Sequence, residues 1–242
     1  EHFTLEWELD TSKIAEISIN GYQTVTRKSE LTEQEMMFYN RADSFSEMIP
    51  YYNSFKTKIQ VEKPKFYIVP QAYEQVIERL LLNDVRVREM ERDSLVSVHV
   101  YYIKDYSSPK TPYEGHFLHT NIEVEKRPEQ VQLYKGDYWI EVNQESNKYI
   151  VETLEPQSVD GFFAWNFFDG ILQQKEWFSD YSFEPKAIQF LKENPEVEAE
   201  FENKKSTDAS FAANSWAQLY FIYKKSPYYE KTVNRFPVYR IE

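Results

Sequence analysis

The sequence predicts an α+β fold, with a central βαβ unit, antiparallel strands, and C-terminal helices packed on one face. Alternating apolar residues in the first two thirds indicate half-buried strands. A helical apolar pattern between two short extended stretches indicates the βαβ unit, and helix-start residues dominate the last third. We expect three parts: N-terminal strands with a packed connecting segment (1–63), a central α+β domain (64–184), and a helical segment packed on that domain (185–242).

The N-terminal part begins with a strand, because apolar residues alternate strictly over residues 3–9. A second extended stretch, around residues 17–19, ends at Asn20-Gly21, a dipeptide typical of turns. Residues 40–63 show neither the helical nor the strand period of apolar residues, so we expect a long irregular connection. Its apolar segment 49–52 predicts that this connection packs against the protein instead of hanging free.

The βαβ unit is predicted over about 25 residues after Pro64. Residues 66–69 form a short apolar run that Pro70 closes. Apolar residues then recur at helical spacing over 73–81, and a new extended stretch begins at 85–87.

Antiparallel strands are predicted next, because residues 96–102 and 118–124 both alternate. The segment 131–142 contains Lys135-Gly136-Asp137 between two alternating stretches, a pattern typical of a β-hairpin. A helix follows over 145–154 and ends before Pro156.

The C-terminal helices are predicted from their start signals. Pro185 and Pro195 suit the first turn of a helix, and Asn194 is a good cap before the second. A longer helix is expected to begin at Thr207 or Asp208.

Composition narrows the classes of partner. The formal net charge of −12 disfavours nucleic acid, whose phosphates would repel the chain. No stretch approaches the roughly 18 apolar residues of a membrane span. Cysteine is absent, which excludes disulfides and thiolate chemistry. Aromatic residues make up 17%, so they supply both core packing and recognition surfaces.

The histidines offer one candidate metal site, formed by Glu114, His116 and His119. The alternation that follows Gly115 favours a loop entering a strand, and strand residues three apart point to opposite faces. We therefore prefer a hydrogen-bonded structural role for these histidines. Nucleophile and phosphate-loop motifs are also missing, so we expect no catalytic residue and no metal cofactor in this chain.

The densest aromatic segment, residues 160–169, has two interpretations. One is an aromatic recognition platform at Trp165, with Asn166 and Asp169 as polar partners. The other is core packing, which we favour because so many large rings together would form a costly exposed patch.

Five segments in order carry a resemblance to a known family. They are Gly21-Tyr22 with Lys28-Ser29-Glu30, Ile49-Pro50-Tyr51-Tyr52-Asn53, Pro64–Gln71 with Val76–Leu80, Tyr113-Glu114-Gly115-His116, and Leu154-Glu155-Pro156 with Trp165–Asp169. Together they resemble the C-terminal, non-catalytic region of some bacterial zinc carboxypeptidases of the carboxypeptidase A type.

The resemblance implies an accessory role for this chain. The zinc ligands and glutamate base of that family have no matching position here, so zinc is expected only in an upstream peptidase domain of the same polypeptide. The expected function is docking on that domain or shaping its groove, in a secreted or periplasmic metallocarboxypeptidase-like protein. The resemblance thus implies a periplasmic or extracellular location.

Candidate docking residues are Trp7, Tyr51, Tyr52 and Phe55, which are large apolar groups near the irregular connection. Packing of these rings on the central sheet stays open as the alternative. A second candidate function, from another class, is a stand-alone glycan- or peptide-binding module with an aromatic surface.

Overall fold

The computed structural model describes all 242 residues and has an α+β fold with antiparallel sheets and several helices. The chain divides into two compact units, Glu1–Glu62 and Lys63–Glu242. Each unit has its own sheets, and each is described separately below.

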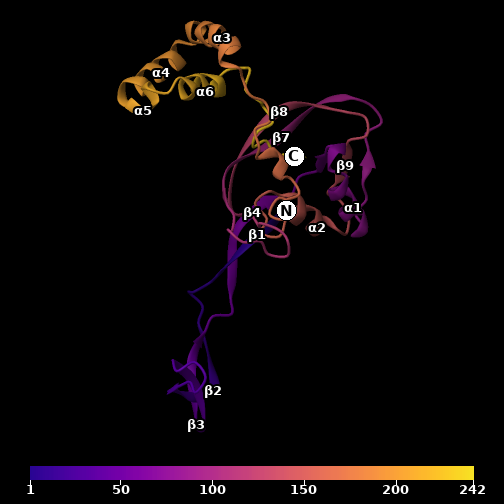
Figure 1. Ribbon diagram of the computed structural model, residues 1–242. Coiled ribbons are helices and arrows are strands. Elements are labelled where there is room, and N and C mark those ends of the chain that lie inside the picture. Colours follow the sequence, from indigo (N-terminus) through magenta and orange to yellow (C-terminus); the bar gives the residue numbers. More distant parts are fainter. The chain divides into compact units, whose positions relative to one another are not determined.

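The first unit consists of two antiparallel strand pairs. Strand β1 (His2–Leu9) pairs with β4 (Phe55–Glu62). Strand β2 (Ala15–Lys28) pairs with β3 (Glu35–Tyr51) to form a long, narrow two-stranded ribbon, which we call the β2–β3 ribbon (Figure 1). The ribbon turns at Ser29–Gln34, where the backbone N–H of Ser29 donates to the carbonyl of Gln34 at 2.8 Å.

The expectation of an irregular connection over 40–63 is wrong, because most of these residues lie in β3 and β4. A two-stranded ribbon with both faces open to solvent imposes no apolar and polar alternation, so its strands carry no period-2 signal. The predicted turn at Asn20-Gly21 is also wrong. Gly21 lies inside β2 opposite Phe45, whose ring atom Cζ would lie 2.7 Å from a Cβ at this position.

The second unit is built on a six-stranded sheet in the order β6-β9-β5-β10-β7-β8. Its strands are β5 (Phe66–Val69), β6 (Arg88–Glu89), β7 (Ser94–Ser107), β8 (Thr120–Leu133), β9 (Tyr138–Glu141) and β10 (Tyr239–Ile241). A buried cluster that includes Ile68, Val98, Val100 and Leu133 forms part of the core beside this sheet.

The predicted βαβ unit is present in a split form. Strand β5 leads through a 3-10 turn (Gln71–Tyr73) and α1 (Glu74–Leu82) to β6, and both strands are antiparallel to β9, which lies between them. The predicted hairpin over 131–142 is wrong, because β8 pairs with β7 whereas β9 pairs with β5 and β6. Strands β5, β10 and β7 separate its two arms, an arrangement that local turn residues cannot reveal.

Helices make up most of the remaining chain. They are α2 (Asn147–Leu154), a 3-10 turn at Asp169–Ile171, α3 (Asp180–Glu193), α4 (Pro195–Thr207), α5 (Ala209–Ala212) and α6 (Ser215–Lys225). Helices α3–α6 lie together and share a core of Phe183, Ala187, Phe201, Phe211, Ile222 and Tyr223 (Figure 1).

The helix start signals hold with two differences. Asn194 and Pro195 begin α4 as predicted, whereas Pro185 lies inside α3 instead of in its first turn. The long helix expected from Asp208 is divided into α5 and α6, because Asn214 caps a new start by accepting from the backbone N–H of Ala217 at 2.9 Å.

The end of the expected helical segment 185–242 belongs to the sheet. Residues Tyr239–Ile241 form β10, which pairs with β5 and β7 in the interior of the sheet. The chain has no helix that is both long and apolar enough to cross a membrane.

Candidate functional site

The structure brings together residues that the sequence placed in two separate candidate sites. His119, from the proposed metal site, lies against Asn166 and Asp169, from the proposed aromatic platform. Together with Ser108 they form a polar group that we call the His119 cluster. Ser108 and His119 flank the loop between β7 and β8, whereas Asp169 begins the 3-10 turn Asp169–Ile171.

Both ring nitrogens of His119 are engaged in hydrogen bonds. Nδ1 lies 2.7 Å from Oγ of Ser108, and Nε2 lies 2.8 Å from Oδ1 of Asp169. A proton on Nε2 would be donated to the Asp169 carboxylate, which leaves Nδ1 to accept the Ser108 hydroxyl. The ring is 5% exposed and contacts the rings of Tyr106 and Phe163, with centroids 4.5 and 5.0 Å away.

The side-chain amide of Asn166 connects the aromatic segment 160–169 to the β7–β8 loop. Its Oδ1 accepts from the backbone N–H of Phe117, and its Nδ2 donates to the Phe117 carbonyl, both at 2.9 Å. The amide therefore satisfies the backbone N–H and carbonyl of Phe117, as a neighbouring strand would. The backbone φ of Asn166 is +67°, a conformation that Asn adopts more readily than most residues. A further bond of 2.9 Å joins the His119 N–H to the Ala164 carbonyl.

The other candidate residues are placed differently. His116 packs its ring edge-on against Trp165, with centroids 5.3 Å apart. Glu114 lies in an exposed turn with a φ of +51°. The core interpretation of the aromatic segment places Phe163, Trp165 and Phe167 in the interior. Phe163 is fully buried, whereas Trp165 and Phe167 are only half-buried and Phe168 is buried in their place.

The His119 cluster has the hydrogen-bond order of a nucleophile, a base and an orienting carboxylate. Its surroundings favour a structural role, in which the cluster holds two segments of the chain together. The imidazole is enclosed by aromatic rings, and the bonds of the cluster continue into the backbone of both segments. The cluster holds the β7–β8 loop against the aromatic segment 160–169.

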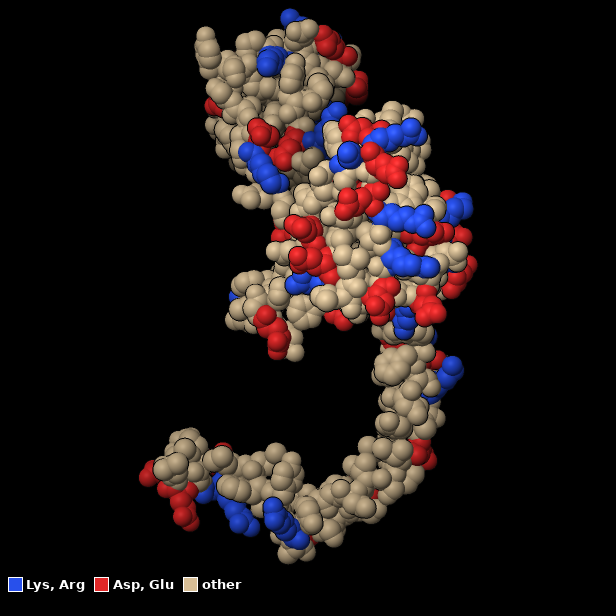
Figure 2. Space-filling view, turned by 90° about the vertical axis from the view of Figure 1, so that its right-hand side faces the viewer, with Lys and Arg blue, Asp and Glu red and all other residues tan.

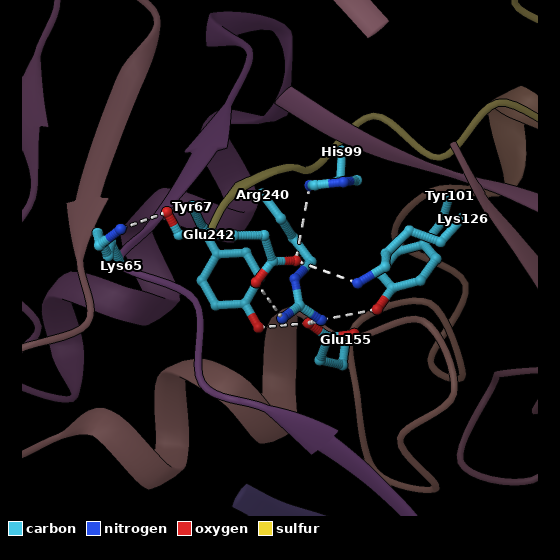
Figure 3. A network of polar contacts seen from close by, with 8 residues as sticks. All are labelled: Lys65, Tyr67, His99, Tyr101, Lys126, Glu155, Arg240 and Glu242. Atoms are coloured by element: carbon cyan, nitrogen blue, oxygen red, sulfur yellow. Dashed lines mark hydrogen bonds and ion pairs between the residues drawn. The ribbon is translucent and has the colours of Figure 1, made fainter. Parts of the chain in front are cut away.

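A second polar network is centred on Arg240 (Figure 3), and Arg240, Glu155, Tyr67 and Tyr101 form its buried part. Its Nη1 donates to Oε1 of Glu155 at 2.9 Å and to the hydroxyl of Tyr101 at 2.7 Å. The Tyr67 hydroxyl donates to the same Glu155 oxygen. The guanidinium thus lies between two tyrosine rings and one carboxylate.

The register of the sheet explains this convergence. Arg240 lies directly opposite Tyr67 on β5 and opposite His99 on β7, so these side chains share a face. Tyr101 is two residues from His99 on β7 and points the same way. Glu242 follows β10 directly, with its carboxylate 3.5 Å from Nη2 of Arg240. Glu155 arrives from the end of α2, where it is the C-cap residue.

The surface end of the network is formed by Glu242. Its Oε1 lies 3.1 Å from Nζ of Lys126 and 3.7 Å from Nδ1 of His99, and its backbone oxygen accepts from Lys65 at 2.7 Å (Figure 3). Polar contacts from β7, β8 and the residue that precedes β5 thereby hold the end of β10.

Burial governs the protonation of this network. Burial raises the pKa of the Glu155 carboxyl, while the charge of Arg240 and the hydroxyl of Tyr67 act to lower it. Burial and the nearby Glu155 carboxylate raise the pKa of Tyr67 well above its usual value, and that of Tyr101 in the same way. Both tyrosines therefore keep their hydroxyl protons at neutral pH. The network thereby connects β10 to the end of α2.

Sequence reasoning missed Arg240 and Ser108. Neither lies in a motif with a known chemical role, and Arg240 sits in the strand that was expected to be helical. Glu155 belongs to the Leu154-Glu155-Pro156 segment of the resemblance, but without a role. An isolated Tyr-Arg-Ile tripeptide gives no signal that its arginine is buried.

Comparison with known proteins adds no relative. No protein-family model matches the chain, and no curated protein or solved structure matches it. The class that the structure itself defines is an α+β protein with a separate two-stranded ribbon.

Proposed function

We propose that this chain is a non-catalytic accessory region of a secreted or periplasmic zinc metallocarboxypeptidase-like protein. Its partner is the peptidase domain upstream in the same polypeptide, which holds the zinc. The chain docks on that domain through the β2–β3 ribbon and shapes its groove. The resemblance supports the identity of the partner, and the exposed apolar side chains of the ribbon support docking.

The observation that carries the proposal is the apolar surface of the β2–β3 ribbon. Met37 and Tyr39 near its turn are each 65% exposed, and Met36, Phe38 and Met48 are also exposed. Figure 2 shows the narrow arm in the lower part of the view as mostly uncharged surface with scattered charged groups. An isolated two-stranded ribbon is marginally stable in water, so a partner that covers these side chains would stabilise it.

The strand register places the exposed groups on both faces of the ribbon. Phe38 lies opposite Val25, whereas Met37 lies opposite Thr26, so neighbouring residues of β3 point to opposite sides. A flat partner surface would cover only one of these faces. The ribbon therefore fits a groove that encloses it.

The sequence-derived docking residues form a second exposed group in the same unit. Trp7, Tyr51, Tyr52 and Phe55 are all exposed. Phe55 lies directly opposite Leu9 at the end of the β1–β4 pair, and Trp7 shares the face of Leu9 because it is two residues away.

Docking is tested by expressing the upstream peptidase domain as a separate chain and measuring association by calorimetry. We expect a one-to-one complex that the double substitution Met37→Ser/Tyr39→Ser weakens roughly tenfold or more, because large apolar groups dominate such interfaces. Gln23→Ser, a polar and exposed change on β2, is the matched control and should leave binding unchanged. Absence of a peptidase domain upstream, or no association at tens of micromolar, would show that the proposal is wrong.

Catalysis is tested on the chain by itself. We expect the purified chain to release no C-terminal residue from a panel of peptides with varied C-termini, with or without added zinc. The family's metal ligands have no counterpart in the sequence, and both nitrogens of His119 are already hydrogen-bonded. Release that a chelator abolishes, measured by mass spectrometry, would contradict the non-catalytic role.

A further inference from the structure

Two exposed tryptophans and a half-buried tyrosine form an aromatic group at helices α3–α6. Trp216 and Tyr220 lie one turn apart on α6, and Trp177 comes from the segment that leads into α3. Trp177 is 56% exposed and Trp216 is 44% exposed. We call these three residues the Trp177 platform.

The ring centres of the platform form a triangle, in which two pairs of rings are nearly parallel and the third pair, Trp177 and Trp216, is tilted by 34°. Trp216 and Tyr220 are inclined by 18° with centroids 4.8 Å apart, and Trp177 is inclined by 24° to Tyr220 at 5.9 Å. The third side of the triangle, between Trp177 and Trp216, is 6.2 Å. Tyr220 and Phe178 both stack with Trp216, and Lys224 lies over the Tyr220 ring, so these two rings are partly covered. Trp177, at 56% exposed, offers the most open aromatic surface of the three.

A cavity of about 290 Å³ adjoins the platform, because Trp177 also lines it. Phe178 and Tyr228 contribute further rings, whereas Ser179, Ser182 and Lys186 contribute hydrogen-bonding groups. Aromatic walls with a few polar groups are typical of small-ligand sites, and the volume lies near the lower end of their range.

We propose that the Trp177 platform and this cavity bind a neutral oligosaccharide. One face of a sugar ring presents C–H groups, which are attracted to the negative face of an indole. Its hydroxyls then reach the serine hydroxyls and the Lys186 ammonium at the rim of the cavity. This site is distinct from the docking ribbon, and the inference does not depend on the proposed function.

Charge distinguishes this ligand from others that bind aromatic residues. Glu176 and Lys186 both line the cavity, so its wall carries one charge of each sign and favours neither a cation nor an anion. Lys224 Nζ lies 4.8 Å from the Tyr220 ring centre, and Lys186 Nζ lies 4.9 Å from that of Tyr228, so these two rings already have cationic partners. The net charge of −12 disfavours polyanionic sugars. A proline-rich peptide needs a groove between upright rings, which near-parallel overlapping rings do not provide.

The test is titration of the full chain with neutral hexasaccharides of α- and β-linked glucose, mannose and N-acetylglucosamine. Tryptophan fluorescence and calorimetry report binding. We expect at least one sugar to bind, and Trp177→Ala and Trp216→Ala each to weaken it by roughly tenfold or more. Trp216→Phe, which keeps an aromatic face, should retain most of the affinity.

Tyr181→Ala is the matched control, because Tyr181 is an exposed aromatic residue of α3 that is not part of the platform. It should leave sugar binding unchanged. Circular dichroism of each variant verifies that the helices are intact. The inference is wrong if no sugar of the panel binds at about 10 mM. It is also wrong if both tryptophan variants bind like the wild type, or if the platform binds a proline-rich peptide or choline instead.

Discussion

Arg240→Met is expected to lower the free energy of unfolding by about 3–5 kcal/mol, because it leaves the Glu155 carboxylate buried without its cation. Both side chains are at most 2% exposed. Chemical denaturation of the full chain, followed by circular dichroism, measures the change. Arg127→Met is the matched control, since Arg127 and Glu125 form an exposed ion pair, and it should have little effect.

The double variant Arg240→Met/Glu155→Leu separates an ion-pair effect from a packing effect. Removing both charges avoids the unpaired carboxylate, so the double variant should be more stable than Arg240→Met alone. A similar loss of stability in both variants would show that Arg240 acts through its packing. An unchanged free energy of unfolding in Arg240→Met would contradict the buried network as an anchor of β10.

Phe163→Ala is expected to lower the free energy of unfolding by about 3–5 kcal/mol, because a fully buried ring is replaced by a cavity. Phe163 packs between His119 and Phe236, with ring centroids 5.0 and 5.8 Å away. Its loss removes the apolar support of the His119 cluster as well as its own buried area. Thermal and chemical unfolding of the full chain measure the effect.

Phe167→Ala is the control from the same segment. The Phe167 ring is half-buried, with the Arg79 guanidinium 4.5 Å from its centre, so its removal is expected to cost no more than roughly 2 kcal/mol. Equal losses for the two variants would contradict the distinction between the buried and half-buried rings.

Elements with a strong local pattern could be predicted from the sequence. Helix α1 and strand β5 follow from apolar spacing, α2 lies within the predicted 145–154, and Asn194-Pro195 marks the start of α4. In each case the signal lies within a few neighbouring residues, because helix caps and buried faces depend on local spacing.

Strand pairing could not be predicted in the same way. The β2–β3 ribbon buries neither face, so its strands show no alternation, and the 131–142 segment has hairpin residues but no hairpin partner. Strand β10 is only three residues long, and its place between β5 and β7 depends on partners more than 130 residues away.

The candidate site likewise could be predicted only in part from the sequence. The sequence singled out His119, Asn166 and Asp169 by residue type, but assigned them to separate sites. A hydrogen bond of 2.8 Å joins His119 to Asp169 across 50 residues, and Asn166 Nδ2 lies 3.2 Å from the same ring nitrogen. The Trp177 platform likewise combines an i, i+4 pair on α6 with a ring that precedes α3.

The sequence by itself determined the α+β class, the helix starts and the acidic, aromatic-rich character of the chain. Those properties depend on composition and on contacts within a few residues. The tertiary structure decided which strands pair, which aromatic rings are buried and which polar groups meet around His119 and Arg240. Those properties depend on packing between distant segments, whose free energy is not encoded in any single local pattern.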